Sequence, residues 1–322
     1  MQDDTLLQEV PSLDLAHFTA GTPEQKQQFV GDLGNAYERI GFVAIRNHGL
    51  SDALINELYA AVQLFFSLPE AVKLKYYRAE LAGQRGYIPK LQERAKGRTV
   101  ADLKEFYHVG QAPDGDTGEG YPDNIWPDEV PQFKESALEA YRTLEAAGKQ
   151  MLRAIALHLD LPETYFDAKV HRGNSILRPI HYFPIEDPDA VPDDAVRAAA
   201  HGDINLITLL MGASAEGLQV LRRDGAWIPI TALPDQIVVN VGDMLDRLTN
   251  HRLKSTVHRV VNPPREKMRT SRYSIPFFMH PRAEMDLTCL EQCVDAQNPK
   301  RYEDTTAGAF LEERLREIGL KK

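Results

Sequence analysis

The stretch that decides the fold of this chain runs from residue 201 to residue 274. It begins with HGD at residues 201–203, continues through STVHRVV at residues 255–261, and ends with RYS at residues 272–274. We expect residues 200–210 to form one β-strand, in which alternate side chains share a face, so that His201 and Asp203 point the same way. His258, on a second and distant strand, would complete the cluster.

Two imidazoles and one carboxylate can occupy one face of an octahedron around a metal ion and leave the opposite positions open. This ligand set is typical of non-haem Fe(II) oxygenases, although the same short pattern also occurs by chance in chains that bind no metal. The neighbouring runs VVNVGDM at residues 238–244 and YSIPFFM at residues 273–279 both predict strands. Because a barrel of strands can hold ligands rigidly at its mouth, the sequence predicts a metal site made by His201, Asp203 and His258.

Arg272 and Ser274 predict an anion site on the last of these strands. The guanidinium of Arg272 offers a planar fork for a carboxylate, and Ser274 lies two residues on, on the same face of a strand. RTS at residues 269–271 has the same spacing. We prefer residues 272–274 because the apolar run that follows them continues the strand.

Nearby histidines and acids are expected to lie outside the metal cluster. His48 lies between Asn and Gly in a loop, and His181 points to the opposite face of its strand from Tyr182. His251 is a loop residue that contacts a metal ligand at most. Because Gly242-Asp243 is typical of a turn, Asp203 is the better carboxylate ligand.

Many ordered motifs agree with one known family. They are VPSLDL at residues 10–15, GFVAIRNHG at 41–49, FFSLP at 65–69, RGY at 85–87, DLKEF at 102–106, LRPIHY at 177–182, and the HGD, GD, HRV and RYS motifs at 201, 242, 258 and 272. With these motifs, the chain resembles the isopenicillin N synthase-like family of Fe(II)- and 2-oxoglutarate-dependent dioxygenases. The matches cover nearly the whole chain, and they specify the family far better than the substrate.

The resemblance implies an α+β fold, with a double-stranded β-helix (jelly-roll) barrel buttressed by N-terminal helices. It implies a single dioxygenase domain over residues 1–322. Within that domain we expect a helix-rich N-terminal part at 1–170, a catalytic jelly-roll core at 171–285, and a C-terminal segment at 286–322.

The resemblance also implies the chemistry. Fe(II) would be held by His201, Asp203 and His258, and 2-oxoglutarate would be the cosubstrate, bound by Arg272, Ser274 and Tyr182. Several plant relatives have an Asn two residues before this Tyr, but the residue here is Ile180, so that polar contact is missing. With O2, the enzyme would hydroxylate or desaturate a small organic molecule and release succinate and CO2.

Two other functions remain open at this point. The first is a 2-oxoglutarate-independent Fe(II) oxidase of the isopenicillin N synthase type, in which Arg272 binds a carboxylate of the substrate itself. The second is a binding protein that keeps the fold and lacks turnover. The fold alone does not decide which of these functions the protein has.

The residues that contact the substrate are predicted less sharply. Loops at 83–89 and 110–127 are rich in turn residues and would cover the barrel mouth. Candidates for the substrate pocket are Arg178, Arg85, Tyr87, Phe106 and Phe278. For Tyr87 and Phe106 a place in the core is equally compatible with the pattern, and Arg178 could bind an acidic substrate or an acidic side chain.

Three helices follow from caps and periodicity. TPE at residues 22–24 combines an N-cap residue, a proline in the first turn and an acid at the positive end of the helix dipole. Ser51 caps a second helix with Phe65 on its apolar face, and residues 134–160 carry the longest helical pattern. A helix of about 25 residues is roughly 37 Å long, enough to lie along a barrel.

Composition limits the class of partner. The chain has 322 residues, 43% hydrophobic and 26% charged, and its net charge of −10 argues against nucleic acid or an anionic membrane as a partner. The acidic N-terminus lacks a secretion signal, no run of about 18 apolar residues is present, and Cys289 and Cys293 are expected to be reduced thiols. We therefore expect a cytoplasmic monomer that acts on a small molecule.

Overall fold

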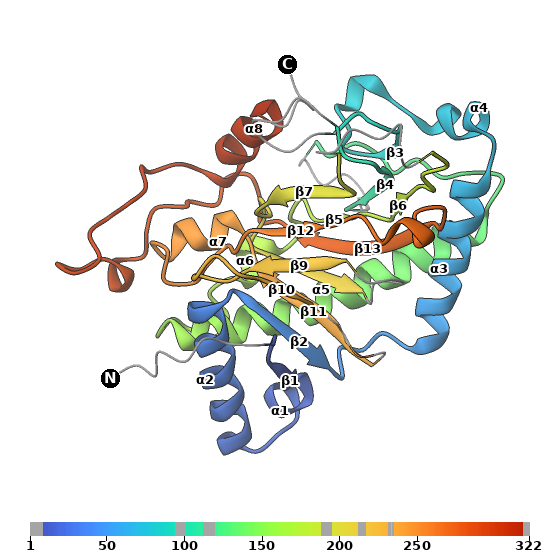
Figure 1. Ribbon diagram of the computed structural model, residues 1–322. Helices are drawn as coiled ribbons and strands as arrows, with labels where there is room; N and C mark the ends of the chain where they lie inside the picture. Colours follow the sequence, from blue (N-terminus) through green and yellow to red (C-terminus); the bar gives the residue numbers. More distant parts are fainter. Residues whose placement is uncertain are drawn as a thin grey trace.

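Two β-sheets form a barrel at the centre of the protein (Figure 1). This computed structural model describes residues 9–93, 101–111, 120–187, 195–211, 217–230, 233 and 235–317. Within the described residues the larger sheet has nine strands, in the order β1 (Ser12–Asp14), β2 (Phe42–Arg46), β11 (Ile237–Val241), β8 (Ile207–Met211), β13 (Arg272–Met279), β5 (Ile176–Leu177), β4 (Glu105–Gly110) and β3 (Gly86–Ile88), with β6 (Ile180–Tyr182) paired to β13 and β4. The smaller sheet has four, in the order β10 (Trp227–Pro229), β9 (Leu218–Leu221), β12 (His258–Val260) and β7 (Ala198–His201).

Three helices, α2 (Pro23–Arg39), α3 (Asp52–Ser67) and α5 (Gln132–His158), cover the outer face of the larger sheet. The other described helices lie around the barrel and are α1 (Leu15–Thr19), α4 (Glu70–Lys73), α6 (Asp167–Val170), α7 (Asp243–Leu248) and α8 (Ala307–Glu317). Short 3-10 turns lie at η1 (Leu74–Tyr76), η2 (Ala79–Leu81), η3 (Arg265–Lys267) and η4 (Glu291–Cys293). The long helix α5 packs against α2 and α3 and against strands β8 and β13.

The three predicted helices are confirmed, and side-chain caps explain where two of them, α2 and α3, begin. Thr22 Oγ1 accepts a hydrogen bond from the backbone N–H of Gln25, and the Gln25 side chain accepts one from the backbone N–H of Thr22, which completes a capping box. Ser51 caps α3 in the same way through the N–H of Leu54. These caps are local in sequence, so they could be predicted without the tertiary structure.

Two hydrophobic clusters lie on the two sides of the larger sheet. One cluster packs the outer face of that sheet against α2, α3 and α5. The other fills the interior of the barrel, with Phe42 and Ile180 from the larger sheet facing Val220 and Val260 from the smaller one. Burial of this apolar surface from both sides favours folding and fixes which face of each strand points inward.

Strand β13 shows how this alternation positions polar residues. Ile275, Phe277 and Met279 belong to the outer cluster beneath the helices. The alternate residues Arg272 and Ser274 therefore point into the barrel. The same strand therefore packs apolar side chains against the helices on one face and presents Arg272 and Ser274 to the barrel interior on the other.

The fold is an α+β double-stranded β-helix supported by N-terminal helices, as predicted. Strands β1 to β4, which precede residue 171, hydrogen-bond into the same sheet as strands of the core. The predicted division at residue 171 is therefore one of composition, helix-rich before and strand-rich after, and does not divide the sheet.

The prediction of one strand over residues 200–210 was wrong. Strand β7 ends at His201, and β8 begins at Ile207 in the other sheet. Asp203 lies in the segment that joins them, where its carbonyl oxygen accepts a hydrogen bond from the N–H of Asp243 at 2.7 Å. Strand alternation is therefore not the reason that His201 and Asp203 converge.

Two glycines of α2 give a matched test of how α2 meets α5. A Cβ at Gly31 would touch nothing within 4 Å, whereas a Cβ at Gly34 would lie 2.0 Å from ring atoms of His158. Gly31→Ala is expected to raise the free energy of unfolding by about 0.5–1 kcal/mol, because alanine favours the helix. Gly34→Ala should lower it by about 1–3 kcal/mol, because the helices must separate. Denaturant unfolding of both variants checks this, and equal effects would contradict the close contact.

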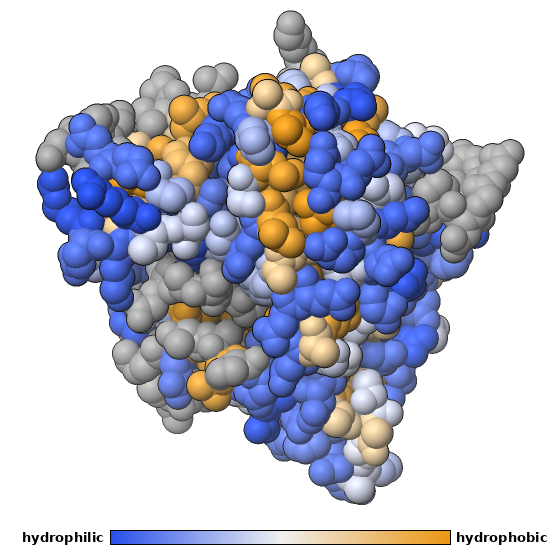
Figure 2. Space-filling view, turned by 90° about the vertical axis from the view of Figure 1, so that its right-hand side faces the viewer, coloured by the Kyte–Doolittle hydropathy of each residue, from blue (hydrophilic) through white to orange (hydrophobic). Residues whose placement is uncertain are grey.

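Hydrophilic side chains cover most of the face shown in Figure 2, interrupted by a band of hydrophobic residues. Large apolar side chains exposed in the described residues include Leu64 in α3 and Leu74 in η1. None of the described helices combines the length and the apolar character needed to cross a membrane. Cys289 and Cys293 are both buried and carry free thiols.

Candidate active site

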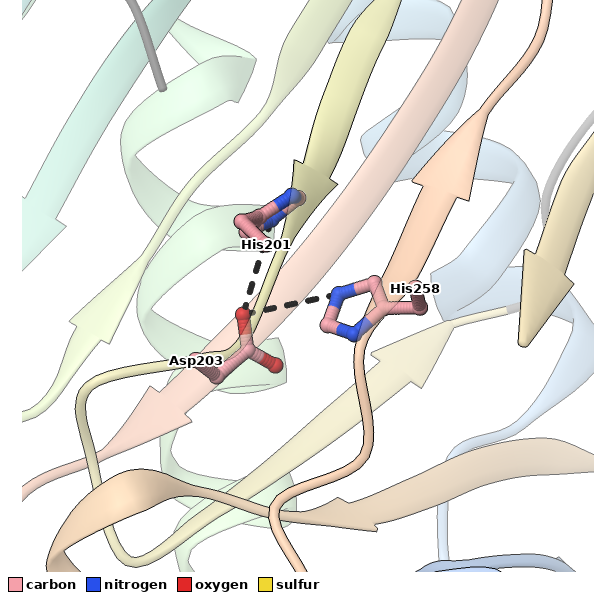
Figure 3. A group of neighbouring side chains, drawn as sticks. All are labelled: His201, Asp203 and His258. Carbon is pink, nitrogen blue, oxygen red and sulfur yellow. Dashed lines mark ion pairs between the residues drawn. The ribbon is translucent and has the colours of Figure 1, made fainter. Parts of the chain in front are cut away.

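His201, Asp203 and His258 come together at the mouth of the barrel (Figure 3). One possible ligand atom of each residue lies within 4.8 Å of the others. Asp203 Oδ1 is 3.9 Å from His201 Nε2 and 3.7 Å from His258 Nε2. The two histidines are directly opposite each other in the antiparallel pairing of β7 with β12. One ion could contact all three atoms.

Backbone carbonyls orient both imidazoles. The Nδ1 of His201 lies 2.7 Å from the carbonyl oxygen of Ala199, and the Nδ1 of His258 lies 3.2 Å from that of Thr256. A carbonyl oxygen can only accept, so each Nδ1 carries the hydrogen and each Nε2 keeps a free lone pair. This tautomer is the one that a metal ligand needs.

The Asp203 carboxylate is oriented by two buried side chains. Its Oδ2 accepts a hydrogen bond from Thr208 Oγ1 at 2.6 Å and another from Asn240 Nδ2 at 2.8 Å. Its Oδ1 is left to face the two imidazoles. Thr208 lies on β8 and Asn240 on β11, so the larger sheet fixes the carboxylate while the smaller sheet fixes the histidines.

The protonation states also suit metal binding. Burial and the neighbouring His258 lower the pKa of His201 to about 4, so its ring is neutral near pH 7. Burial raises the pKa of Asp203, but the two imidazoles and the bonds from Asn240 and Thr208 outweigh it, and the pKa lies below its usual value. A carboxylate and neutral imidazoles are the forms that bind a divalent cation.

Thr208 gives a test of this orientation. Thr208→Val keeps the shape of the side chain but removes the hydroxyl that holds Asp203 Oδ2, so Fe(II) affinity is expected to fall by about 10- to 100-fold. Thr208→Ser, which keeps the hydroxyl, should bind Fe(II) nearly as the parent protein does. Competition for Fe(II) against a chromophoric chelator measures both. Equal affinities for the Val and Ser variants would refute a role for this hydrogen bond.

The other acids near the site are used differently. Asp243 begins α7 instead of closing a simple turn, and its Oδ1 accepts a hydrogen bond from Ser255 Oγ at 2.6 Å. Burial and the charges of Asp203 and Asp246 raise the pKa of Asp243 to about 6. Asp246 binds His251, whose Nδ1 lies 2.8 Å away. His251 therefore contacts Asp246 and not a metal ligand.

The two other histidines that the sequence placed outside the cluster have structural contacts. His48 Nδ1 accepts a hydrogen bond from the N–H of Leu50. His181 stacks on Tyr273, with ring centroids 4.8 Å apart, and its Nδ1 lies 2.7 Å from the buried carboxylate of Glu105. Both predictions are confirmed.

Arg272, Ser274 and Tyr182 lie together inside the barrel. Arg272 and Tyr182 are directly opposite each other in the pairing of β13 with β6, and the guanidinium carbon lies 4.9 Å from the centre of the Tyr182 ring. Arg272 is 1% exposed and Ser274 4%. The arrangement gives a buried positive charge with hydroxyl groups beside it.

A second arginine, which the sequence did not single out, reinforces this charge. Arg197 is buried, and its Nη2 donates to the carbonyl oxygen of Thr270 at 2.9 Å, two residues before Arg272. Burial and the charge of Arg272 lower the pKa of Arg197 to about 10. Two buried guanidinium groups near one another favour an anion at this end of the barrel.

A cavity of about 350 Å³ opens beside the three side chains that could bind a metal. His201 and Asp203 line it, as do Arg178 and Phe278, two of the predicted substrate contacts. The C-terminal helix α8 contributes Leu311, Arg314 and Leu315 to another side. A small molecule in this cavity would lie next to the metal.

The other predicted substrate contacts lie behind the cavity lining. Arg85 and Tyr87 are each 1% exposed, and neither is among the described residues that line the cavity. Arg85 packs over the backbone of Gly110, and Tyr87 donates to the buried carboxylate of Glu105. Phe106 is also buried, and it reaches the site indirectly through Arg178. We therefore assign Arg85 and Tyr87 structural contacts.

Several lining residues were missed from the sequence. They are Asn174, His280, Glu93, Asp102, Lys104, His108 and the residues of α8. Two of these positions could have been inferred from strand alternation. His280, just after β13, continues the inward series of Arg272, Ser274 and Phe278, and His108 shares a face of β4 with Phe106. Asn174, Glu93, Asp102 and Lys104 lie outside the named strands and helices, and the residues of α8 come from a helix near the other end of the chain, so their approach to the cavity depends on tertiary contacts.

The fold and this cluster define a class. A double-stranded β-helix with two histidines and one carboxylate at its mouth, beside a small cavity, is the architecture of a non-haem iron oxygenase.

Comparison with known proteins gives the family. Residues 10–129 match the family model described as non-haem dioxygenase in morphine synthesis N-terminal, and residues 173–281 match the 2OG-Fe(II) oxygenase superfamily. The chain is 35% identical over 320 residues to the proline hydroxylase buaE of Petromyces alliaceus, covering 95% of this chain and 98% of that one.

Solved structures agree. A 2OG-Fe(II) oxygenase family protein from Caulobacter crescentus is 43% identical, with a TM-score of 0.85 over 97% of this chain and 100% of that one. A Neurospora crassa protein, solved in complex with alpha-KG and 5-formyluracil, is 30% identical, with a TM-score of 0.84 over 98% of this chain and 97% of that one. The chain belongs to the 2OG-Fe(II) oxygenase superfamily.

The activity follows from membership. The protein is an Fe(II)- and 2-oxoglutarate-dependent dioxygenase that oxidises a small organic molecule, with O2 as cosubstrate and release of succinate and CO2. The resemblance and the cofactors predicted from the sequence are thus confirmed. The similarity to named 2-oxoglutarate-dependent enzymes favours this activity over the 2-oxoglutarate-independent oxidase.

Proposed function

We propose that His201, Asp203 and His258 hold the Fe(II) and that Arg272, with Ser274 and Tyr182, binds the distal carboxylate of 2-oxoglutarate. The observation that carries the metal assignment is the convergence of two Nε2 atoms and Asp203 Oδ1, with each Nδ1 directed at a backbone carbonyl. When bound, iron and 2-oxoglutarate supply the oxidising chemistry with O2, while the protein supplies geometry.

The position of each residue then determines whether it holds the metal ligand or binds the cosubstrate. Thr208 and Asn240 hold the carboxylate ligand. Arg272 fixes one end of the cosubstrate with charge-assisted hydrogen bonds, each worth about 1.5–3 kcal/mol, and Arg197 adds a second positive charge nearby. The barrel interior around Phe42 and Ile180 keeps this end dry, which strengthens those bonds.

Arg178 and Phe278 are proposed to contact the primary substrate, since both line the cavity next to His201 and Asp203. The relatives named for small molecules support a substrate of this size, because one is a proline hydroxylase and another was solved with 5-formyluracil. A cavity of about 350 Å³ is at the small end of the range for such ligands.

The test is an anaerobic titration of the Fe(II)-loaded protein with 2-oxoglutarate, followed by its weak visible charge-transfer band. A saturable band, with succinate formed in proportion to O2 consumed once a substrate is found, is the expected result. An iron-loaded protein that gives no band at any 2-oxoglutarate concentration would overturn the cosubstrate site.

We further propose that the protein works as a monomer in the cytoplasm, without a nucleic-acid or membrane partner. Its net charge of −10 supports this, because an acidic protein is repelled by polyanions. Light scattering of the purified holoenzyme would reveal an oligomer if this proposal is wrong.

A further inference from the structure

Two residues that line the substrate cavity carry buried polar atoms without a partner in the described part of the chain, on adjacent segments. Asn174 precedes β5 and His280 follows β13, and the N–H of His280 donates to Ser175 Oγ at 3.1 Å, which holds the segments together. Both residues line the cavity. Asn174 Oδ1 and His280 Nδ1 are buried and have no hydrogen-bond partner among the described residues. Unpaired buried polar atoms are costly, so a bound molecule should pair with them.

Arg178 is held rigidly in a neighbouring part of the cavity lining. This part, here called the charged wall, consists of Arg178, Glu93, Asp102 and Lys104. Its guanidinium lies between two rings, 4.5 Å from the centre of Phe106 and 4.8 Å from that of Phe278. Its Nε donates to His108 Nε2 at 2.5 Å, which places the hydrogen of that ring on Nδ1, toward the carbonyl of Gly83. Arg178 therefore presents donors to the cavity from a fixed position.

The charges of this wall already cancel. Lys104 Nζ lies 2.6 Å from Glu93 Oε1 and 2.9 Å from Asp102 Oδ2, and Arg178 Nη1 lies 3.4 Å from Glu93. The wall thus holds two cations and two carboxylates, all close to one another. An anion on Arg178 would be repelled by Glu93, and a cation near Glu93 would be repelled by Lys104 and Arg178.

His280 adds no charge. Burial and the charge of Arg178 lower the pKa of His280 to about 4, so near pH 7 its ring is neutral and offers one donor and one acceptor. Asn174 likewise carries an acceptor and a donor on one amide. Asn174 and His280 therefore add uncharged donors and acceptors beside the charged wall, whose four charges balance.

We propose, on the basis of the function proposed above, that the primary substrate is an uncharged molecule with an amide-like pair of C=O and N–H groups, received by Arg178, Asn174 and His280. A carbonyl oxygen accepts from Arg178, and the N–H donates to Asn174 Oδ1 or to the open ring nitrogen of His280. A carboxylic acid that pairs with Arg178 is the competing class, and the charge of Glu93 argues against it.

Matched probes separate these classes. Benzamide, benzoate and benzylamine carry a neutral amide, an anion and a cation on one ring, and the corresponding cyclohexane compounds form a second set. Each is titrated calorimetrically into the Fe(II)- and 2-oxoglutarate-loaded protein near pH 7 without O2. We expect at least about tenfold tighter binding of the amide than of the acid or the amine in one set or both. Tighter binding of the acid, or binding of none of the compounds, would overturn the proposal.

Two variants test the charge balance in opposite directions. Glu93→Gln leaves the wall with one excess positive charge, so the preference should move toward the acid by about tenfold or more. Arg178→Met keeps packing between the two rings but leaves one excess negative charge, so the preference should move toward the amine. If only one of the two variants folds, the change in its preference among the acid, the amide and the amine tests the proposal by itself. A change in the same direction in both, or in neither, would contradict the role of this wall.

Two controls keep this result separate from the function of the iron site. Arg153→Met removes an arginine of α5 that pairs with Asp167 at 2.7 Å and does not line the cavity, and it should leave all probe affinities unchanged. The charge-transfer band of bound 2-oxoglutarate must be present in every sample. Its loss would refute the cosubstrate site, whereas a normal band with the acid preferred would refute the substrate class alone.

Discussion

Asp203→Asn is expected to lower turnover by more than about 10³-fold, because it removes the anionic ligand of the metal cluster. The amide would still fit between Thr208 and Asn240, so the variant should fold. The loss should appear as low iron content after anaerobic loading with Fe(II), and as an absence of O2 uptake driven by 2-oxoglutarate.

Asp243→Asn is the matched control for this result. Asp243 is a neighbouring buried acid that also lines the cavity but lies outside the cluster of His201, Asp203 and His258. Iron content in this variant should stay near that of the parent protein. Loss of iron from Asp243→Asn, with retention in Asp203→Asn, would reverse the assignment of the carboxylate ligand.

Arg272→Ala is expected to raise the dissociation constant of 2-oxoglutarate by about 100-fold while sparing iron. The alanine removes the two-pronged donor for the distal carboxylate, and a loss of about 2.7 kcal/mol corresponds to this factor. Titration of the charge-transfer band measures the constant directly. Arg272→Lys should fall between the two, since an ammonium keeps the charge and loses the fork.

Arg197→Gln helps to interpret this result. Arg197 contributes charge from further away and donates to the carbonyl of Thr270, so its loss should weaken 2-oxoglutarate binding less than the loss of Arg272. Unchanged cosubstrate affinity in Arg272→Ala would be incompatible with the proposed site. Arg272 would then be assigned a packing contact with Tyr182 instead of a contact with 2-oxoglutarate.

Local signals in the sequence predicted the helices well. The capping pattern at Thr22 and the period of residues 134–160 depend on neighbours within a few positions, and the structure has α2 from Pro23 and α5 from Gln132 to His158. The same reasoning failed at residues 200–210. The alternation of His201 and Asp203 is compatible with a strand, but the chain leaves β7 at His201 and is held by a bond from the distant Asp243.

The substrate wall shows a second limit. Phe278 lies on β13 with its side chain on the inward face, whereas Arg178, which was expected on a strand, lies between β5 and β6. Arg85 and Tyr87 were singled out because a loop was expected to cover the barrel mouth, but both are buried behind it. Asn174 and Glu93 lie outside the strands and helices, and the residues of α8 lie on a helix far from the other lining residues in sequence, so no local rule could place them beside the cavity.

The sequence by itself determined the fold class and the family, because ordered motifs are a property of the chain alone. The motifs also singled out the residues proposed to bind the metal, and strand alternation singled out Arg272 and Ser274, which are proposed to bind the cosubstrate carboxylate. The tertiary structure decided which oxygen of Asp203 faces the histidines, which ring nitrogens are open, and which charges surround the substrate cavity. These depend on contacts such as Thr208 with Asp203 and Lys104 with Glu93, whose partners are brought together only when both sheets and the loops between them have folded.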